Sequence, residues 1–222
     1  IPTSSFIERL IAALAKQGVE VLLVGRIKES YTHLDNVIVA GYRDNRFRRL
    51  NKLLFFLKYL ISFLLFRRKE WIKLRNELSK LGLNNINFLI TAQALLWHKP
   101  DVFHLQWAKS TRKFMWVKAF KIKYILSFRG AHINYSPITV KGLAEMYREC
   151  FPVLDGFHGV SKAICEEASK YGAELQKCKV IYSGLNQDNF LSFRNEKQLS
   201  FNSPIRIISV GRDHWKKGYS IA

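Results

Sequence analysis

The residues whose types and spacing could carry chemistry are concentrated near the end of the chain. Residues 205–210 are mostly apolar, as in a buried parallel strand. Gly211 then lets the backbone turn at the carboxyl end of that strand, where open α/β sheets bind ligands. Arg212 and Lys217 follow, and a guanidinium fork beside an ammonium charge suits a diphosphate. A strand that runs into a basic surface loop has the same spacing, so the pattern alone leaves both interpretations open.

Other polar side chains follow expected strands earlier in the chain. His104 lies near the end of an expected strand at 101–105, and Arg129 opens a polar loop after one at 123–128. His132, in that loop, is either a ligand contact or an ordinary surface histidine. His104 either lines a cleft or is a core histidine with satisfied hydrogen bonds. Four further histidines have no motif context and receive no role: His33, His98, His158 and His214.

The elements that must position these residues alternate between helix and strand. Ser5 and Glu8 have the spacing of a capping box before a helix with one apolar face, which Gly18 ends. Strands are expected at 19–24, 36–40, 101–105, 123–128, 156–160 and 180–182, and helices at 87–97, 110–120, 139–150 and 161–171, with Ser110 and Ser161 as caps. This order predicts an α/β fold with a Rossmann-like, doubly wound and mostly parallel sheet. Such a sheet would start with a strand before residue 1, so the sequence is expected to be truncated there.

Several segments, taken together and in order, resemble one enzyme family. "SVGRDHWKKGYSIA" at 209–222 is similar to the Gly-Arg…Lys-Gly segment of family 4 glycosyltransferases, retaining enzymes with the two-domain GT-B fold. Residues 179–190 resemble the family's "k-v-i-x-N-G-v-D…F" segment, with Ser183 in place of the usual Asn, and 101–104 resemble its "D-v-i-H" segment. Val160-Ser161 resembles the "vS" segment, and residues 2–14 resemble the opening "P-x-x-S-E-T-F-I…L".

The resemblance implies a division into domains. Residues 1–190 would form the GT-B N-terminal, acceptor-side domain, and 191–204 would be a polar linker. Residues 205–222 would start the C-terminal, donor-binding domain, so the sequence is expected to be truncated at both ends and inactive on its own. The implied activity is transfer of a sugar, with retention of configuration, from a nucleotide-sugar to a glycan or lipid-linked acceptor in cell-surface polysaccharide or glycolipid synthesis.

The resemblance also assigns roles to the candidate residues. Gly211, Arg212 and Lys217 match the positions that bind the donor diphosphate without a metal. Arg129 stands where the family usually has its catalytic-region histidine, and His132 lies two residues after the following glycine. These two are the catalytic candidates, and His104, Gly130 and Ser161 are expected in the acceptor cleft. No cofactor is expected, because the nucleotide-sugar is a substrate. A nucleotide-sugar epimerase or a glycosyl phosphorylase with the GT-B fold would use the same cations.

Charge and cysteine content restrict the partners and the compartment. The 222 residues carry a formal charge of +19, which attracts polyanions such as nucleic acid, an anionic membrane or an acidic substrate. No RNA- or DNA-binding signature accompanies the charge, so no nucleic acid is expected. The contrasting hypothesis is a non-catalytic basic adaptor that binds RNA or anionic lipid. Three cysteines without a Cys-x-x-Cys pair indicate reduced thiols in a cytoplasmic protein and no metal site.

Residues 46–75 form an apolar run with arginines at both ends. Lys52 and Lys58 interrupt the run, so a membrane-spanning helix is not expected. One interpretation is a core helix with a single wet edge. The other is an interfacial helix whose aromatic face, Phe55, Phe56, Tyr59 and Phe63, enters the headgroup region of an anionic membrane. The second interpretation would place the protein peripherally on the inner face of the plasma membrane.

Overall fold

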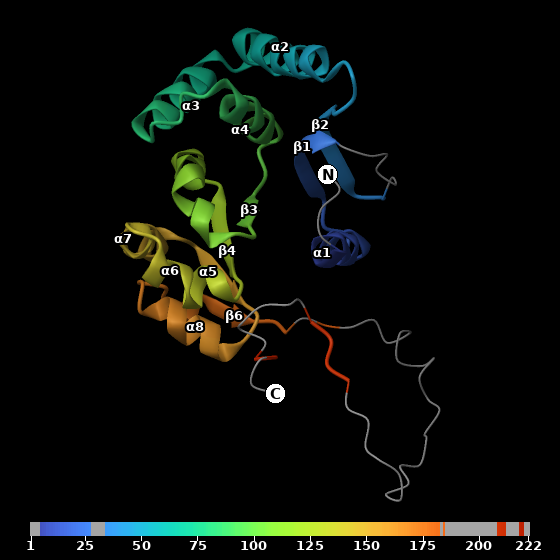
Figure 1. Ribbon diagram of the computed structural model, residues 1–222. Helices are drawn as coiled ribbons and strands as arrows, with labels where there is room; N and C mark the ends of the chain where they lie inside the picture. Colours follow the sequence, from blue (N-terminus) through green and yellow to red (C-terminus); the bar gives the residue numbers. More distant parts are fainter. Residues whose placement is uncertain (1–4, 28–33, 183, 185–207, 212–217, 220–222) are drawn as a thin grey trace, which may run out of the picture. The chain divides into compact units, whose positions relative to one another are not determined.

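The computed structural model describes residues 5–27, 34–182, 184, 208–211 and 218–219. The chain divides into two compact units, residues 1–182 and 183–222. The elements of the first unit, in chain order (Figure 1), are α1 (Ser5–Lys16), β1 (Val21–Ile27), β2 (Val37–Arg43), α2 (Arg48–Phe66), α3 (Arg68–Lys80), α4 (Ile86–His98), β3 (Val102–Leu105), η1 (Ala108–Phe120), β4 (Lys123–Phe128), α5 (Ala131–Asn134), α6 (Ser136–Thr139), α7 (Leu143–Cys150), η2 (Phe151–Val153), β5 (Gly156–Gly159), α8 (Lys162–Ser169), η3 (Leu175–Lys177) and β6 (Cys178–Val180).

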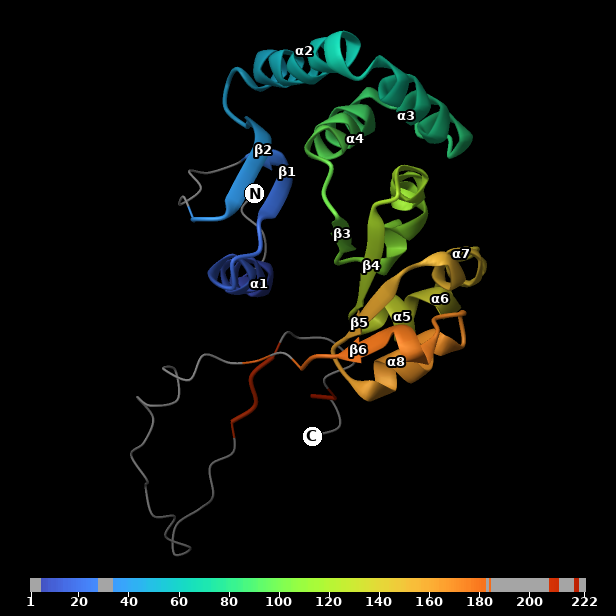
Figure 2. The same cartoon turned by 180° about the vertical axis from the view of Figure 1, so that it is seen from behind.

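The strands of the described residues form two parallel sheets. β1 pairs with β2 along its whole length, and β3, β4, β5 and β6 pair in chain order to form a four-stranded sheet, which Figure 2 shows from behind. Each connection within the larger sheet contains helical segments, as parallel pairing requires. The prediction of an α/β fold with parallel strands is therefore confirmed. In the described part of the chain these strands belong to two sheets and not to one.

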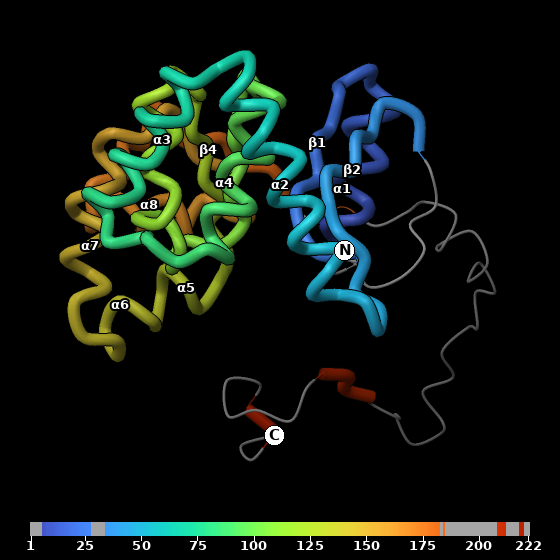
Figure 3. Tube along the Cα trace, turned by 90° about the horizontal axis from the view of Figure 1, so that it is seen from above, coloured from blue at the N-terminus to red at the C-terminus, as the bar shows by residue number. Residues whose placement is uncertain are grey.

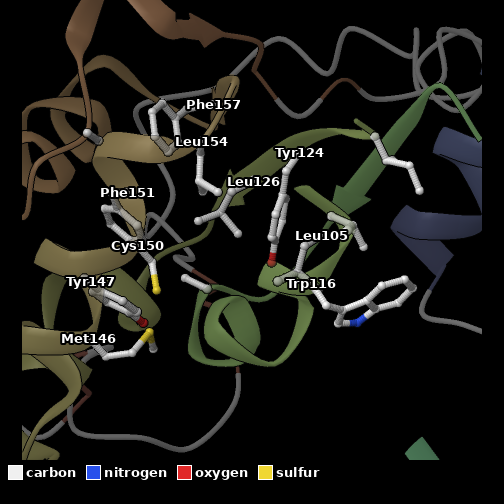
Figure 4. Packing of buried hydrophobic residues seen from close by; sticks show 14 of the residues in the cluster. Leu105, Trp116, Tyr124, Leu126, Met146, Tyr147, Cys150, Phe151, Leu154 and Phe157 are labelled. Atoms are coloured by element: carbon white, nitrogen blue, oxygen red, sulfur yellow. The ribbon is translucent and has the colours of Figure 1, made fainter. Parts of the chain in front are cut away.

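The main core lies against one face of β4. Tyr124, Leu126 and Phe128 alternate along the strand and are fully buried. They pack with Trp116 of η1, with Phe157 of β5 and with side chains from α7 and η2 (Figure 4). Burial of these large side chains fixes β4 as a central strand. The alternate residues of β4 point to the other face, and that face carries the polar groups described below.

Three helices, α2, α3 and α4, pack together in the same unit (Figure 3). α4 is apolar on most of its circumference and is largely buried, as such a helix must be. Arg67 joins the three helices. Its guanidinium donates to the backbone oxygens of Leu96 (3.2 Å) and Trp97 (2.7 Å) at the end of α4, and it pairs with Glu70 of α3. The side chain of Arg67 therefore satisfies carbonyl groups that the end of a helix leaves free.

Several predicted elements differ from the structure in their bounds or type. The predicted α-helix at 110–120 is a 3-10 helix that starts at Ala108, without a side-chain cap from Ser110. The hydroxyl of Thr111 donates to the carbonyl of Ala108 (2.7 Å) and so competes for a backbone acceptor in the first turn. The predicted helix at 139–150 is divided, because Gly142 adopts a φ of 76° and α7 starts only after it.

The second unit gives little support to the strand predicted at 205–210. Its described residues 208–210 are not in a strand, and Ile208 and Val210 are 87% and 88% exposed. A buried strand needs a neighbouring strand, and no described residue pairs with this segment. That part of the prediction is wrong. Residues 205–207 and the predicted linker at 191–204 lie outside the described residues.

Candidate functional site

A row of polar side chains crosses the larger sheet near the carboxyl ends of its strands. His104 Nε2 of β3 lies 2.9 Å from Ser127 Oγ of β4, and the same hydroxyl lies 2.9 Å from His158 Nδ1 of β5. His158 Nε2 donates to the backbone oxygen of Ile181, just after β6 (3.1 Å). The register opposes Ser127 to His158 directly. Parallel pairing therefore brings side chains of β3, β4 and β5, and a backbone oxygen just after β6, into one line.

The protons of this row can be counted from its contacts. Arg129 can only donate, so its contact with Gln106 Oε1 (2.8 Å) turns the Gln106 amide nitrogen toward His104 Nε2 (3.2 Å). His104 Nε2 is then an acceptor. When both imidazoles are neutral, the single hydroxyl proton of Ser127 serves only one of its two imidazole contacts. With neutral imidazoles, one of these two contacts is therefore left without a proton.

Arg129 connects this row to α1. Its guanidinium carbon lies 4.3 Å from the ring centroid of Phe6, and its Nη2 donates to Gln106. The Nε of Arg129 is buried without a hydrogen-bond partner among the described residues. Burial lowers the pKa of Arg129, because the charged form loses hydration. A cation held between an aromatic ring and an amide, with an Nε that no described residue accepts from, is suited to an anionic or polyhydroxylated ligand.

His132 lies next to an exposed aromatic side chain. Its ring is 5.6 Å from that of Trp107, at 30° between the planes, and Trp107 also contacts Phe6 edge-on at 6.0 Å. The Nδ1 of His132 is buried without a partner among the described residues. The hydroxyl of Tyr147 donates to the backbone oxygen of His132 (2.9 Å) and fixes the position of α5. Burial, with a contribution from the charge of Lys109, lowers the pKa of His132, so its neutral form is favoured.

The structure thus connects three of the predicted residues, His104, Arg129 and His132, through the contacts just described. Gly130 contributes through its backbone. Its φ of 40° lets the chain turn from β4 into α5, a conformation that side chains other than glycine's rarely adopt. The expected polar loop after β4 is therefore partly a short helix. Ser161 acts as the predicted cap, because its hydroxyl accepts from the backbone nitrogen of Ile164 (3.3 Å).

The predicted diphosphate-binding residues belong to the second unit. Gly211 is described and exposed, whereas Arg212 and Lys217 lie outside the described residues. Gly218 has a φ of 69°, a value that favours glycine. The described residues therefore do not test the prediction that Gly211, Arg212 and Lys217 bind a diphosphate.

Sequence reasoning missed five members of this cluster: Phe6, Gln106, Trp107, Ser127 and His158. A period of two along the strands could have found part of it, since His104 and Gln106, and likewise Ser127 and Arg129, are two residues apart. The pairing of Ser127 with His158 depends on the register between β4 and β5, which no local pattern determines. Phe6 belongs to α1, near the start of the chain, and no pattern in the sequence linked it to this site.

The cluster is a site of hydrogen bonds and charge. Within the described residues, no group of three or more His, Cys, Asp or Glu side chains is placed to hold a metal ion. Comparisons of the chain with protein-family models, with curated proteins and with solved structures give no match. The function is therefore argued from the geometry of the cluster and from the sequence motifs.

Proposed function

We propose that the chain belongs to a retaining glycosyltransferase of the GT-B type. It would transfer a sugar from a nucleotide-sugar to a glycan or lipid-linked acceptor, in the synthesis of cell-surface polysaccharide or glycolipid at the cytoplasmic side of the membrane. The proposal assigns residues 1–190 to the acceptor-side domain and residues 205–222 to the donor-side domain.

The observation that carries the proposal is the polar cluster at the carboxyl ends of β3, β4 and β5. Ligands of open parallel sheets bind at this edge. The cluster combines aromatic faces, on Trp107 and Phe6, with hydrogen-bonding groups on Gln106, Arg129 and His132. Apolar and aromatic walls with a few convergent polar groups are typical of small-molecule sites. A sugar offers the complementary surface, because its C–H faces pack on aromatic rings and its hydroxyls hydrogen-bond around them.

The proposed mechanism divides the work between the two domains. Sugar transfer leaves a nucleoside diphosphate, so negative charge develops on the β-phosphate in the transition state. Arg212 and Lys217 would stabilise that charge, as the family motif implies, without a metal. Arg129 would add positive charge on the acceptor side, and His132 would hold a sugar hydroxyl. The His104–Ser127–His158 row would hold Gln106 in place beside the acceptor through the contact between His104 and Gln106.

Product analysis with the full-length protein tests this proposal. The protein would be incubated with single nucleotide-sugars and candidate glycan or lipid-linked acceptors, and release of nucleoside diphosphate would be measured. A glycosyltransferase releases it only with an acceptor present, and NMR of the product gives the retained anomeric configuration. An epimerase acts without a glycan acceptor, and a phosphorylase requires inorganic phosphate. A protein with no turnover on any donor, which binds RNA or lipid instead, would contradict an enzymatic function.

A further inference from the structure

One face of α2 exposes apolar side chains that the rest of the described chain does not cover. These are Leu50, Leu54, Leu57, Ile61, Leu64 and Leu65, here called the leucine strip, and they are between 37% and 70% exposed. At 3.6 residues per turn, the six positions fall within an arc of about 100°. The strip is continuous along almost the whole helix, and a contiguous apolar surface of this kind marks an interaction site.

The opposite face of α2 already has its partners. Tyr59 and Phe63 are buried, and both rings contact Trp97 at the end of α4. The side-chain amide of Gln93 in α4 donates to the backbone oxygen of Phe56 (3.0 Å). The expectation that the aromatic face enters a membrane is therefore wrong, because that face holds α2 on the protein. The leucine strip points the other way and is left for an external partner.

Charge around the strip identifies the kind of partner. Residues 45–69 contain eight basic residues and no acidic one. The acidic residues that border this segment are engaged, Asp44 with Arg26 and Arg48, and Glu70 with Arg67 and Lys99. Four exposed cations stand at the two ends of α2: Arg46, Arg49, Arg68 and Lys69. A shallow hollow of about 470 Å³ lies among the residues 45–50, beside the start of the strip.

An apolar strip between two groups of cations matches the chemistry of an anionic bilayer surface. We infer that α2 docks on anionic lipid, with the leucine strip at the boundary of the acyl chains and the terminal cations at the phosphates. A nucleic acid would neutralise the cations but leave the leucines in water. None of the helices described is long and apolar enough to cross a membrane. The helix would therefore lie in the plane of the interface.

This inference stands apart from the proposed function, because lipid binding is measured without any sugar donor. The full-length protein would be sedimented with vesicles of phosphatidylcholine alone and with vesicles of an equal mixture of phosphatidylcholine and phosphatidylglycerol. We expect binding to the mixed vesicles that exceeds binding to the neutral ones by about tenfold or more and weakens as salt is added.

Two variants separate the apolar and the ionic contributions. Leu54→Gln with Ile61→Gln should weaken binding about tenfold or more, because two apolar side chains no longer enter the interface. The control for this double variant is Val153→Gln with Leu175→Gln. It replaces two apolar side chains outside α2 that are exposed to a similar extent, 51% and 53%.

The second variant replaces Arg46, Arg49, Arg68 and Lys69 with glutamine. It should weaken binding to the mixed vesicles by about tenfold or more, because the terminal cations no longer face the phosphates. Its control removes the same number of positive charges by replacing Lys113, Lys123, Lys141 and Lys179, which are exposed elsewhere. Arg67 is left unchanged in the variant and in its control, because its guanidinium holds the end of α4.

Circular dichroism and urea unfolding would first show that each variant is folded. Equal binding to the two kinds of vesicle, or equal loss in a variant and its control, would overturn the inference. A second copy of the chain is the competing occupant of the strip. If the protein ignores mixed vesicles at low salt, and sedimentation detects a dimer that Leu54→Gln with Ile61→Gln dissociates, the strip is a protein interface.

Discussion

The imidazole of His104 lies between Ser127 and Gln106, away from most of the solvent. Burial lowers the pKa of His104 to about 4, and the charges of His158 and Arg129 act in the same direction. The folded protein therefore binds fewer protons than the unfolded chain between about pH 4 and the ordinary histidine value near 6.5. Neutral His104 therefore contributes to the free energy of unfolding. This contribution is fully present above that window and is lost as the pH falls through it, by up to about 3 kcal/mol.

The loss of stability at low pH can be tested with the variant His104→Gln. Glutamine can place its amide oxygen, which accepts hydrogen bonds as Nε2 does, near the position of Nε2, but it does not titrate. In urea unfolding, the wild-type protein should lose about 2 kcal/mol more between about pH 7 and about pH 5 than the variant does. An identical loss in both proteins would mean that His104 is readily protonated in the folded state.

Arg129 and His132 are the two candidates for the catalytic role in the proposed glycosyltransferase. Arg129 contacts Gln106 and Phe6, and its Nε has no hydrogen-bond partner among the described residues, whereas His132 is held mainly by its backbone and by Trp107. We predict that Arg129→Ala lowers turnover more than His132→Ala does, by about 10²-fold if Arg129 stabilises transition-state charge. Kinetics of the two variants with the acceptor in excess provide the comparison. The reverse order would assign the catalytic role to His132.

At the scale of the elements, the contact between β5 and α8 is unusually close. A methyl group at Gly159 would lie 2.2 Å from Cys165 Sγ, closer than any real contact of this kind. Gly159→Ala should therefore destabilise the protein by about 1 to 3 kcal/mol, because the core cannot admit the added atom. Removal of the sulfur in Cys165→Ala should recover part of this loss in the double variant, as a double-mutant cycle would measure.

Gly156 in the same strand provides the matched control. A methyl group there would meet its nearest neighbours at 3.8 Å, an ordinary contact. Gly156→Ala should be neutral or slightly stabilising, because alanine restricts the unfolded chain. If the two substitutions destabilise β5 equally, the strand itself rejects alanine and the sulfur contact is not the cause.

Arg67 and Arg68 are adjacent in sequence but differ in their surroundings. Arg67 donates to two backbone oxygens of α4 and packs on Phe63 and Trp97, whereas Arg68 is exposed. Arg67→Gln should cost roughly 2 to 3 kcal/mol of unfolding free energy, as is typical of hydrogen bonds from a charged group, and Arg68→Gln should be nearly neutral. Equal urea midpoints for the two variants would contradict the role of Arg67 in holding α4.

Elements were predictable where one local signal dominates. β4 was predicted at its observed bounds, and the cap at Ser161 was also correct, because an apolar alternation and a serine before a helix need no tertiary information. For α2 the sequence left two interpretations open, and the one that placed its aromatic face in a membrane was wrong. Both of its faces are apolar, so only the packing of Tyr59 and Phe63 against α4 decides which one is buried. The helix from 139 was wrongly continued through Gly142.

For the whole molecule, the sequence predicted the class of fold better than the site. Alternating helices and strands sufficed for the parallel α/β architecture, and charge and apolar content sufficed to single out the segment of α2. The cluster around Arg129 depends on strand register and on a contact with Phe6 more than a hundred residues away. Such information is a property of the folded chain, so local patterns recovered only three of its members.

A prediction that belongs to the whole molecule concerns the second unit. Under the proposed function, Arg212→Ala and Lys217→Ala should each lower the rate of sugar transfer by about 10²-fold or more, since each would remove a charge that stabilises the leaving diphosphate. Lys113→Ala, on the surface of η1, is the control and should leave turnover unchanged. Wild-type rates in both test variants would make these residues ordinary surface cations.

The contact between Trp107 and His132 gives the site an optical probe of its own. Trp107 is exposed, whereas the other described tryptophans, Trp71, Trp97 and Trp116, are half-buried or buried. A protonated imidazole quenches the fluorescence of a neighbouring indole, so the emission of Trp107 should report the charge of the ring 5.6 Å away. A sugar that displaced water from this pair would change both the intensity and the colour of that emission, without any label being attached to the protein.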